Sequence, residues 1–458
     1  MRKAAIVGVA AVLGLVVALG AASYWLGIRA RQTYTRLLQQ IASNGGFSVS
    51  GLHFQNGWLS STATAALTPP GFPARISIVS RIHFGPLPEL AHQNFMPGMA
   101  VVSTRISVLA AALPGMQPVT AHTMIYLAGN SVTSLNIPAY RRVASGGEGF
   151  SWGPATGKIT VAADQQTVLG NIAFPQVQVS GFKDRLALSG ADLRWSHLSG
   201  ISGPGRMTLS VQRVGNSGQK RPFTIEGLRV ALSDLRHGGK IAANISMHVR
   251  MWNDGISSYG PGQLLLQMTN LDGASFDRFA QGLRTLVRRQ LPPNRRSAEM
   301  RTRTTELLQA LARKNAKITV RSLEIKAAGA QVIGKGRFVL NATNAGGSTY
   351  PEMLLGATTG SAELLVPRSV VANLATDEIR QQLDQYKSDG TLTPTEAGQL
   401  TRKRVRAIVR NALPMYMNRV ASRWHLVSAG ADYMLTATVR QDKLFINGQP
   451  AGPGETGH

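Results

Sequence analysis

The chain of 458 residues contains no cysteine. It therefore forms no disulfide, no thiolate metal site and no cysteine nucleophile. Aromatic residues are also scarce, at 6% of the chain. They do not alternate with the basic runs, as the stacking residues of single-strand nucleic-acid proteins do. These shortages argue against thiol chemistry and mean that nucleic acid is not an expected partner.

Acidic residues are few, with 23 Asp and Glu against 49 Lys and Arg, so the formal net charge is +26. Such an excess favours anionic partners, of which an anionic membrane surface is the one we retain. Hydrophobic residues make up 43% of the chain, which is enough apolar material for a packed core. The 48 glycines are typical of many strands joined by tight turns.

Long apolar runs occur once, at residues 4–28, where 25 residues carry no charge. This length is sufficient to cross a hydrocarbon core of about 30 Å as a helix. We expect a cytoplasmic tail and transmembrane anchor over 1–28, with one span and the bulk of the chain in the periplasm. The membrane-interface residues are then Tyr24, Trp25, Arg29 and Arg31, and a ridge of small residues for helix packing is formed by Ala10, Gly14, Ala18 and Ala22.

A cleaved signal peptide is the alternative, because a basic start precedes the run and small residues follow it at "ALGAAS". The apolar run is, however, longer than a usual signal-peptide core. The helical pattern also continues into residues 29–46, where Tyr34, Leu37, Leu38 and Ile41 share one face. We therefore expect an uncleaved anchor followed by a helical neck.

The body of the chain alternates apolar and polar residues with period two, which is typical of half-buried antiparallel strands. Residues 240–252 show the pattern most clearly, with an apolar residue at every second position from Ile241 to Met251. The expected fold is mainly β (α+β): an elongated antiparallel β-rich domain with a few amphipathic helices. We divide the chain into 1–28 tail and anchor, 29–46 helical neck, 47–271 β-rich region, 272–316 helical insertion, 317–376 second β region, 377–425 basic amphipathic helices and 426–458 terminal hairpin and tail.

The last helical region is expected to contain a helix near 377–387 and a long basic helix over 394–424, kinked at Pro414. Its inward residues are Leu400, Val405, Ile408, Val409, Ala412 and Val420. Its basic residues are then a solvated face or a contact for anionic headgroups.

Two motifs resemble binding loops but lack a required residue. "GAQVIGKG" (329–336) has phosphate-loop spacing, but Gly336 stands where magnesium needs Ser or Thr, which favours a glycine-rich β-turn. "DGTLTPTE" (389–396) matches half of a calcium loop, but Lys387 stands at an oxygen-ligand position, which favours a turn between helices. The nine histidines are scattered. We expect no catalytic, cofactor-binding or metal residues, and no cofactor.

The order of several short motifs resembles that of a known family. "LHFQNGWLSSTATAAL" follows the neck, "IHFGPLP" comes next, and "GADYMLTATVRQDKLFINGQP" ends the chain. The chain resembles the YdgA-like family of Gram-negative inner-membrane and periplasmic proteins of unknown function. The structural family motif is Gly57, Trp58, Ser60 and Ser61, and Gln55-Asn56 before it depart from the usual pattern. In "IHFGPLP", Phe84 stands where the family tends to place a histidine.

The resemblance implies a bitopic inner-membrane protein with a large periplasmic β-rich domain, and it supplies no catalytic residue. By analogy alone, the layout is similar to AsmA-like proteins, whose extended sheets handle lipid. We therefore expect a non-enzymatic, membrane-anchored envelope protein that binds or scaffolds, and that shelters lipid acyl chains in a β groove. The alternative is a protein–protein interaction or homo-oligomerisation module at the inner membrane, with a membrane protein as partner. A periplasmic hydrolase is a lesser alternative.

Trp58 is expected to fasten the neck to the sheet, beside a turn at the start of the first strands. Trp58→Ala should therefore lower the thermal unfolding midpoint of the protein, measured by circular dichroism. Unchanged thermal stability combined with lost membrane or ligand association would instead assign Trp58 to binding.

Overall fold

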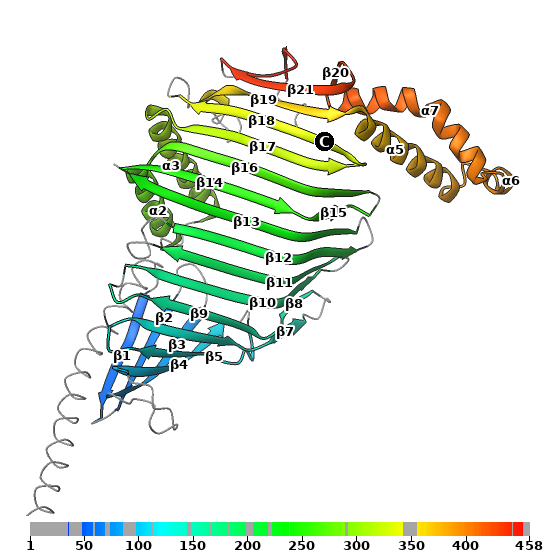
Figure 1. Ribbon diagram of the computed structural model, residues 1–458. Coiled ribbons are helices and arrows are strands. Elements are labelled where there is room, and N and C mark those ends of the chain that lie inside the picture. Colours follow the sequence, from blue (N-terminus) through cyan, green and yellow to red (C-terminus); the bar gives the residue numbers. More distant parts are fainter. Residues whose placement is uncertain are drawn as a thin grey trace, which may run out of the picture. The chain divides into compact units, whose positions relative to one another are not determined.

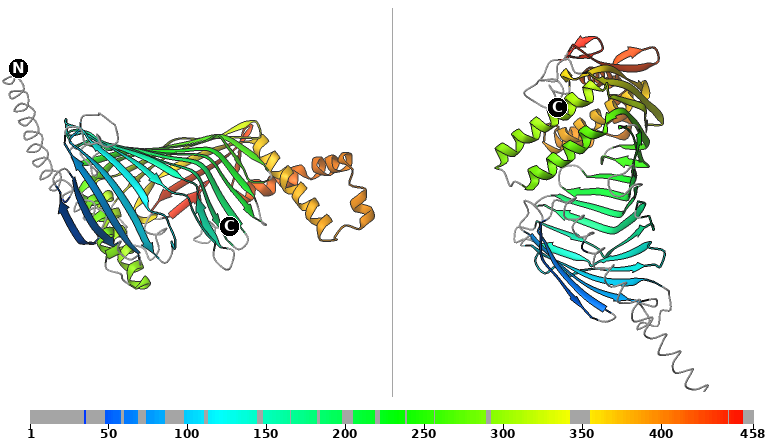
Figure 2. Two further views of the ribbon diagram at one scale, coloured as in Figure 1. Left: turned by 90° about the horizontal axis from the view of Figure 1, so that it is seen from below. Right: turned by 90° about the vertical axis from the view of Figure 1, so that its left-hand side faces the viewer.

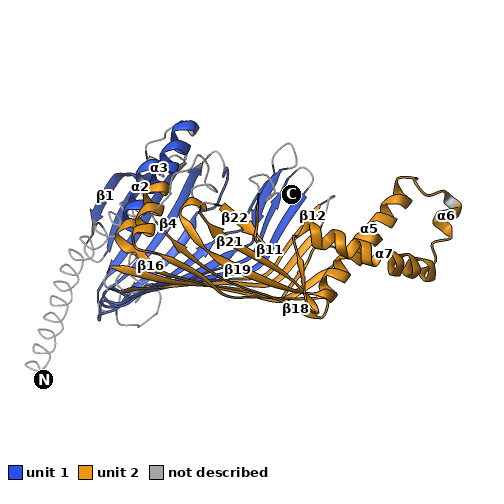
Figure 3. Cartoon of the chain, turned by 90° about the horizontal axis from the view of Figure 1, so that it is seen from above, with its two compact units in different colours: residues 1–209, 277–303 blue, residues 210–276, 304–458 orange. Residues whose placement is uncertain are grey.

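The protein is described by a computed structural model. It covers residue 35 and residues 48–57, 60–68, 74–85, 98–110, 113–143, 148–164, 166–181, 184–197, 205–218, 222–237, 239–255, 257–288, 292–341, 355–441 and 443–451. The chain divides into two compact units (Figure 3). Unit 1 comprises residues 1–209 and 277–303, and unit 2 comprises residues 210–276 and 304–458.

Unit 1 is built on antiparallel strands (Figure 1). Successive strands pair from β1 to β6, and β6 then pairs with β9, β9 with β10 and β10 with β11. The strands are β1 (Ser48–Asn56), β2 (Ser60–Thr68), β3 (Ala74–Phe84), β4 (Ala100–Ala110), β5 (Val119–Ile125), β6 (Ser131–Ile137), β7 (Tyr140–Val143), β8 (Gly149–Trp152), β9 (Ala155–Val161), β10 (Val168–Ser180) and β11 (Asp184–His197).

The β7–β8 hairpin is placed by β10, which has two partners on one side. The first half of β10 pairs with β9, from Val168 to Ala173, and the second half pairs with β8, from Val177 to Ser180. β7 then pairs with β8. The hairpin therefore continues the sheet of unit 1 beside the second half of β10.

Unit 2 is a second antiparallel ladder. Its pairs are β13–β14, β14–β16, β16–β17, β17–β18, β18–β19, β19–β21, β21–β22 and β22–β23, with β15 and β20 as short side strands. The strands are β13 (Phe223–His237), β14 (Lys240–Val249), β15 (Met251–Asn253), β16 (Ser258–Asp272), β17 (Lys317–Ala327), β18 (Ala330–Leu340), β19 (Thr358–Pro367), β20 (Val427–Ala429), β21 (Asp432–Arg440), β22 (Lys443–Ile446) and β23 (Gln449–Pro450).

Three elements are divided between the units: β12 (Gly205–Gly218), α2 (Gly273–Arg288) and α3 (Pro293–Arg313). Unit 2 also contains α5 (Arg368–Ser388), α6 (Pro394–Gly398) and α7 (Arg402–Arg423). α5 and α7 pack against each other and extend past the strand ends of unit 2 (Figure 2).

The prediction of a mainly antiparallel β fold is confirmed, and several element limits need correction. The helix expected near Asp377 begins at Arg368, directly after Pro367. The helix expected over 394–424 is two helices, because Gln399–Thr401 interrupt it and Thr401 caps α7 by accepting from the Arg404 N–H. Pro414 lies inside α7. The expected glycine-rich turn at 329–336 is mostly strand β18, with Gly329 at φ +81° in the preceding turn.

Among the described residues, no helix combines the length and apolar character needed to cross a membrane. The anchor expected over residues 4–28 lies outside the described part of the chain, as does the neck apart from residue 35. The anchor therefore stays a prediction.

The core of unit 1 lies on one face of its sheet. Ala63, Ile82, Phe84, Ala100 and Val102 pack there as one cluster. Cross-strand pairs place Ile82 opposite Val102 and Ser61 on this face, while Val79 alternates to the other face. Ile82 is 1% exposed and Val79 is 38% exposed. Period-two alternation thus separates a buried face from an open one within a single strand.

Ile82→Ala should lower the free energy of unfolding of unit 1 by about 2–5 kcal/mol, because it removes a buried aliphatic side chain and leaves a cavity. Denaturant unfolding of the full chain measures the change. Val79→Ala on the same strand is the control and should shift stability by less than about 0.5 kcal/mol. Equal effects at both positions would contradict the assignment of the two faces.

Candidate functional site

The strongest candidate site is the apolar face of unit 2, by which we mean the sheet face that carries Leu266 and its cross-strand partners. One row of directly paired residues crosses eight strands, from β13 through β14, β16, β17, β18, β19 and β21 to β22. Its members are Leu232, Ile245, Leu266, Val320, Gly336, Ala362, Ala437 and Ile446. We call this set the central row.

Every member of the central row is apolar and half-buried. Adjacent strands lie about 4.8 Å apart, so eight strands extend the row over about 34 Å. An acyl chain in one leaflet spans half of a hydrocarbon core of about 30 Å. The row is therefore long enough to accommodate an acyl chain laid across the strands.

Helices cover this face at the two ends of its strands, on either side of the central row. At one end, α5 and α7 pack on Val366 and Tyr433 through Val371, Ile379 and Val420. Their cluster also takes in Ala327, Val370, Ala375, Tyr416 and Ala421. At the other end, the second half of α3 packs Leu311 and Ala312 against Ile241, Ala243 and Leu271. No member of the central row belongs to either cluster.

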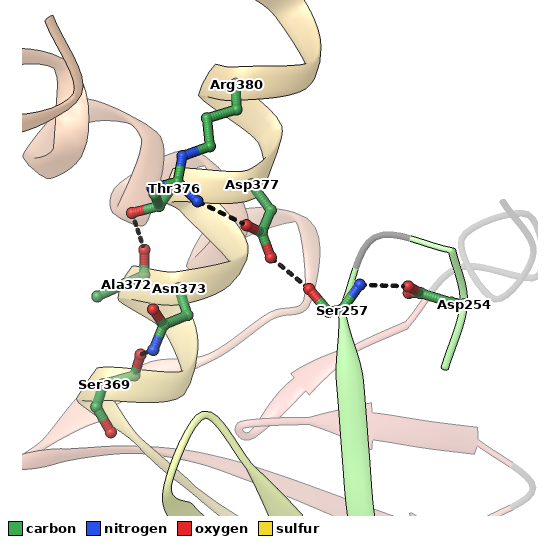
Figure 4. A network of polar contacts seen from close by, with 8 residues as sticks. All are labelled: Asp254, Ser257, Ser369, Ala372, Asn373, Thr376, Asp377 and Arg380. Atoms are coloured by element: carbon green, nitrogen blue, oxygen red, sulfur yellow. Dashed lines mark hydrogen bonds and ion pairs between the residues drawn. The ribbon is translucent and has the colours of Figure 1, made fainter. Parts of the chain in front are cut away.

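The α5 end is held to the sheet by a polar network that starts in the β15–β16 connection (Figure 4). The Ser257 hydroxyl donates to Asp377 on α5, and the Ser257 N–H donates to Asp254 Oδ1 over 2.8 Å. Asp377 Oδ1 also lies 3.8 Å from Arg380 Nη1. α7 is in turn linked to α5 by an ion pair, in which Arg423 Nη2 lies 2.9 Å from Glu378 Oε1. These contacts fix the helical end of the apolar face.

Tyr259 lies beside this network. Burial raises the pKa of its phenol above the usual value, and the charge of Asp254 adds to the rise. The phenol is therefore a neutral donor at physiological pH, and its hydroxyl lies 3.5 Å from Asp254 Oδ2. This chemistry suits a structural polar cluster in which Ser257 is held by two carboxylates.

The opposite face of the same strands mixes polar side chains with exposed apolar ones, among them Leu235, Ile333 and Leu365. A hollow of about 420 Å³ there is lined by His248, Gln263, Glu324, Lys326 and Gln331, among others. Hydrogen bonds from Ser322 and Gln263 hold the pKa of the Glu324 carboxyl below its usual range. Glu324 is therefore an ionised, hydrogen-bonded group and is poorly suited to act as an acid at neutral pH.

The predicted site residues fall in two groups. The membrane-interface and helix-packing residues, namely Tyr24, Trp25, Arg29, Arg31, Ala10, Gly14, Ala18 and Ala22, lie outside the described residues, and so does Trp58. Gly57, Ser60 and Ser61 are described. The Gly57 N–H donates to the Ser60 carbonyl over 2.7 Å, which closes the turn between β1 and β2. A Cβ at Gly57 would lie 2.7 Å from that oxygen, so the turn requires glycine. Ser61 is buried.

The basic helices expose much of their charge. Lys403, Arg406 and Arg410 on α7 are solvent-exposed, whereas Val405, Ile408 and Val409 are half-buried. Asp389 accepts from the Thr391 N–H and hydroxyl, so the calcium-like stretch is a turn between helices, as predicted. Within the described residues, no group of three or more His, Asp or Glu is placed to hold a metal ion.

The central row itself was not identified from the sequence. Alternation marks one apolar side in each strand, but it does not say which residues of different strands stand opposite each other. The β16–β17 pair has a β-bulge between Leu265, which pairs with Ser322, and Leu266, which pairs with Val320. Such a bulge changes which residues of the two strands stand opposite each other from that point on, and the sequence pattern does not reveal it.

Ser257→Ala should loosen α5 from the sheet, because a hydrogen bond to a carboxylate is worth about 1.5–3 kcal/mol. Amide hydrogen exchange should show that the free energy of opening of α5 and α7 falls by about this amount, while that of β16–β18 is unchanged. Ser361→Ala, at an exposed position of β19, is the control. Unchanged protection of α5 in Ser257→Ala would show that apolar packing alone holds the helix.

Comparison with known protein families identifies a family for this chain. A family model described as "Bacterial protein of unknown function (DUF945)" matches residues 1–453. The chain therefore belongs to this bacterial family. No curated protein and no solved structure matches the chain.

Proposed function

We propose that this member of the DUF945 family is a non-enzymatic envelope protein that shelters lipid acyl chains on the apolar face of unit 2. Within the family we place it with the YdgA-like proteins of Gram-negative bacteria. In this proposal residues 4–28 anchor it in the inner membrane by one span, and the two units lie in the periplasm.

The observation that carries the proposal is the central row. Its eight members are contributed by eight strands in register, and all are half-buried apolar residues. Covering such a row removes apolar surface from water, which is favourable by about 25 cal/mol for each Å² that is covered. An acyl chain supplies such cover and, unlike a polar ligand, needs no hydrogen-bond partner.

The helices support the same interpretation. They cover the face at its ends, at Val366 and Tyr433 on one side and at Ile241 and Ala243 on the other. Among the described residues, neither helix cluster includes a member of the central row. The middle of the face carries small residues, Gly336, Ala362 and Ala437, in line with Leu266 and Val320. The apolar character of the row is therefore continuous across these strands.

The basic residues suit a position near anionic headgroups. Lys403, Arg406 and Arg410 are exposed on one helix, and each basic residue near an anionic surface contributes about 1 kcal/mol of attraction. The inner membrane and its lipids are thus the partners in this proposal, and binding requires neither a cofactor nor a catalytic group.

The test uses two neighbouring leucines that face opposite ways on β16. Leu266 belongs to the central row, while Leu265 lies on the opposite face, where it pairs with Ser246 and Ser322. A photo-reactive amino acid is introduced at each position in turn in the full chain, in living cells. After illumination, mass spectrometry should find an acyl-lipid adduct at position 266 and little or none at position 265.

Loss of function provides a second measure with the same pair. Leu266→Gln should weaken binding of a fluorescent fatty acid by about tenfold or more, since the contact of one leucine side chain is worth about 1.5–3 kcal/mol. Leu265→Gln should leave binding unchanged. Equal crosslinking at both positions, or crosslinking of position 266 only to protein, would overturn the proposal; the second outcome would favour the protein–protein alternative.

A further inference from the structure

Unit 1 contains a small basic hollow formed by the β7–β8 hairpin and the ends of β10 and β11. It has a volume of about 170 Å³, and its lining includes Arg141, Ser151, Gln178, Ser180 and Arg185. Drug-sized ligands occupy pockets of about 300–1,000 Å³. The hollow therefore matches a small chemical group and is too small for a whole metabolite.

Strand register brings these side chains to one face. Arg141 stands opposite Ser151, and Ser151 stands opposite Gln178. Ser180 stands opposite both Gly149 and Arg185, two positions further along the same face. Gly149, Ser151 and Ser180 are small, so they leave a depression between the Arg141 and Arg185 side chains. Arg142, the neighbour of Arg141 on β7, also lines the hollow.

The polar groups are suited to a phosphate group. Arg185 donates to Gln178 Oε1 over 2.6 Å, which orients its guanidinium across the depression. A guanidinium donates to two oxygens of a phosphate at once, and serine hydroxyls can donate to a third. Among the described residues that line the hollow, none is a carboxylate that would repel the anion.

The position of the hollow links it to apolar surface. The pairing of β10 with β11 is interrupted at Pro175 and Gly190, where Gly190 has φ +61°, and resumes in the same register, so Gln178 is in phase with Phe174 and Ile172. On β11, Leu193 stands opposite Ile172, and Ala191 stands opposite Phe174. Phe174 and Gln178 are four residues apart, which is about 13 Å along a strand. One continuous face of unit 1 therefore changes from apolar to basic over the length of a short alkyl chain.

We propose that this hollow binds a phosphate group, either as a free anion or as the headgroup of a phosphorylated amphiphile whose chain lies toward Phe174. The amphiphile form rests on the proposed function, since it requires that the protein accepts acyl chains. The free-anion form does not. The shared chemistry is a phosphate held between two arginines from different strands.

The test titrates the full chain, kept in a non-ionic amphipathic polymer, with inorganic phosphate and separately with hexyl phosphate. Isothermal titration calorimetry measures both affinities. Arg141→Gln and Arg185→Gln should each weaken phosphate binding by about tenfold, because each removes a charge-assisted pair of hydrogen bonds. Arg194→Gln is the control. Arg194 lies on the opposite face of β11 from Leu193, and its Nε is 2.6 Å from Asp192 Oδ1. It should bind phosphate as the unsubstituted chain does.

Hexyl phosphate distinguishes the two sources. If the site takes an amphiphile headgroup, the chain binds hexyl phosphate more tightly than inorganic phosphate. Phe174→Ser then removes this difference and leaves the affinity for inorganic phosphate unchanged. Equal affinity for the two ligands assigns it to free phosphate.

Absence of phosphate binding, or equal binding by the Arg141→Gln, Arg185→Gln and unsubstituted chains, would overturn the proposal. Failure of the acyl-chain proposal is seen separately, as absent crosslinking at Leu266, and leaves the phosphate titration valid.

Discussion

The structure depends on one constraint, which is that antiparallel strands must stay in register for their apolar sides to coincide. Backbone hydrogen bonds are satisfied at any register, but a slip of one residue moves a strand's apolar side chains to the other face. In unit 2 eight strands keep a common phase from Leu232 to Ile446. The result is a sheet with one face whose central row is apolar and an opposite face on which polar and apolar residues are mixed. The helices then pack on that sheet only at the ends of its strands, and the Ser257–Asp377 hydrogen bond holds α5 in place there.

Much of the fold could be predicted from the sequence because period-two alternation is a local property. The strand expected over 240–252 is present as β14 and β15, and the terminal hairpin is present as β21 and β22. Helix limits were less predictable. Val370 and Val371 are β-branched and follow strand β19 directly, so they read as more strand, yet tertiary packing in the α5–α7 core makes them helical. The single turn around Thr401 that separates α6 from α7 is likewise weak in the sequence, because apolar positions continue through Leu400.

The candidate sites could not be predicted to the same degree, since both are products of cross-strand alignment. Leu266 and Ala437 are separated by three other strands of the ladder, β17, β18 and β19, and no sequence pattern relates them. Arg141 and Arg185 belong to different hairpins and meet only because β10 pairs with β8 and β11. Single arginines in a chain of +26 charge carry no positional signal. Register, which is a long-range quantity, decides which of them share a surface.

The divided partnership of β10 has a further consequence for how such a protein diversifies. β9 occupies the first half of this strand and the β7–β8 hairpin the second half, and the two do not share a backbone partner residue. The hairpin therefore contributes no backbone partner to β6, to β9 or to the first half of β10. Changes in the length or sequence of the hairpin are thus compatible with an unchanged register between β6, β9 and the first half of β10.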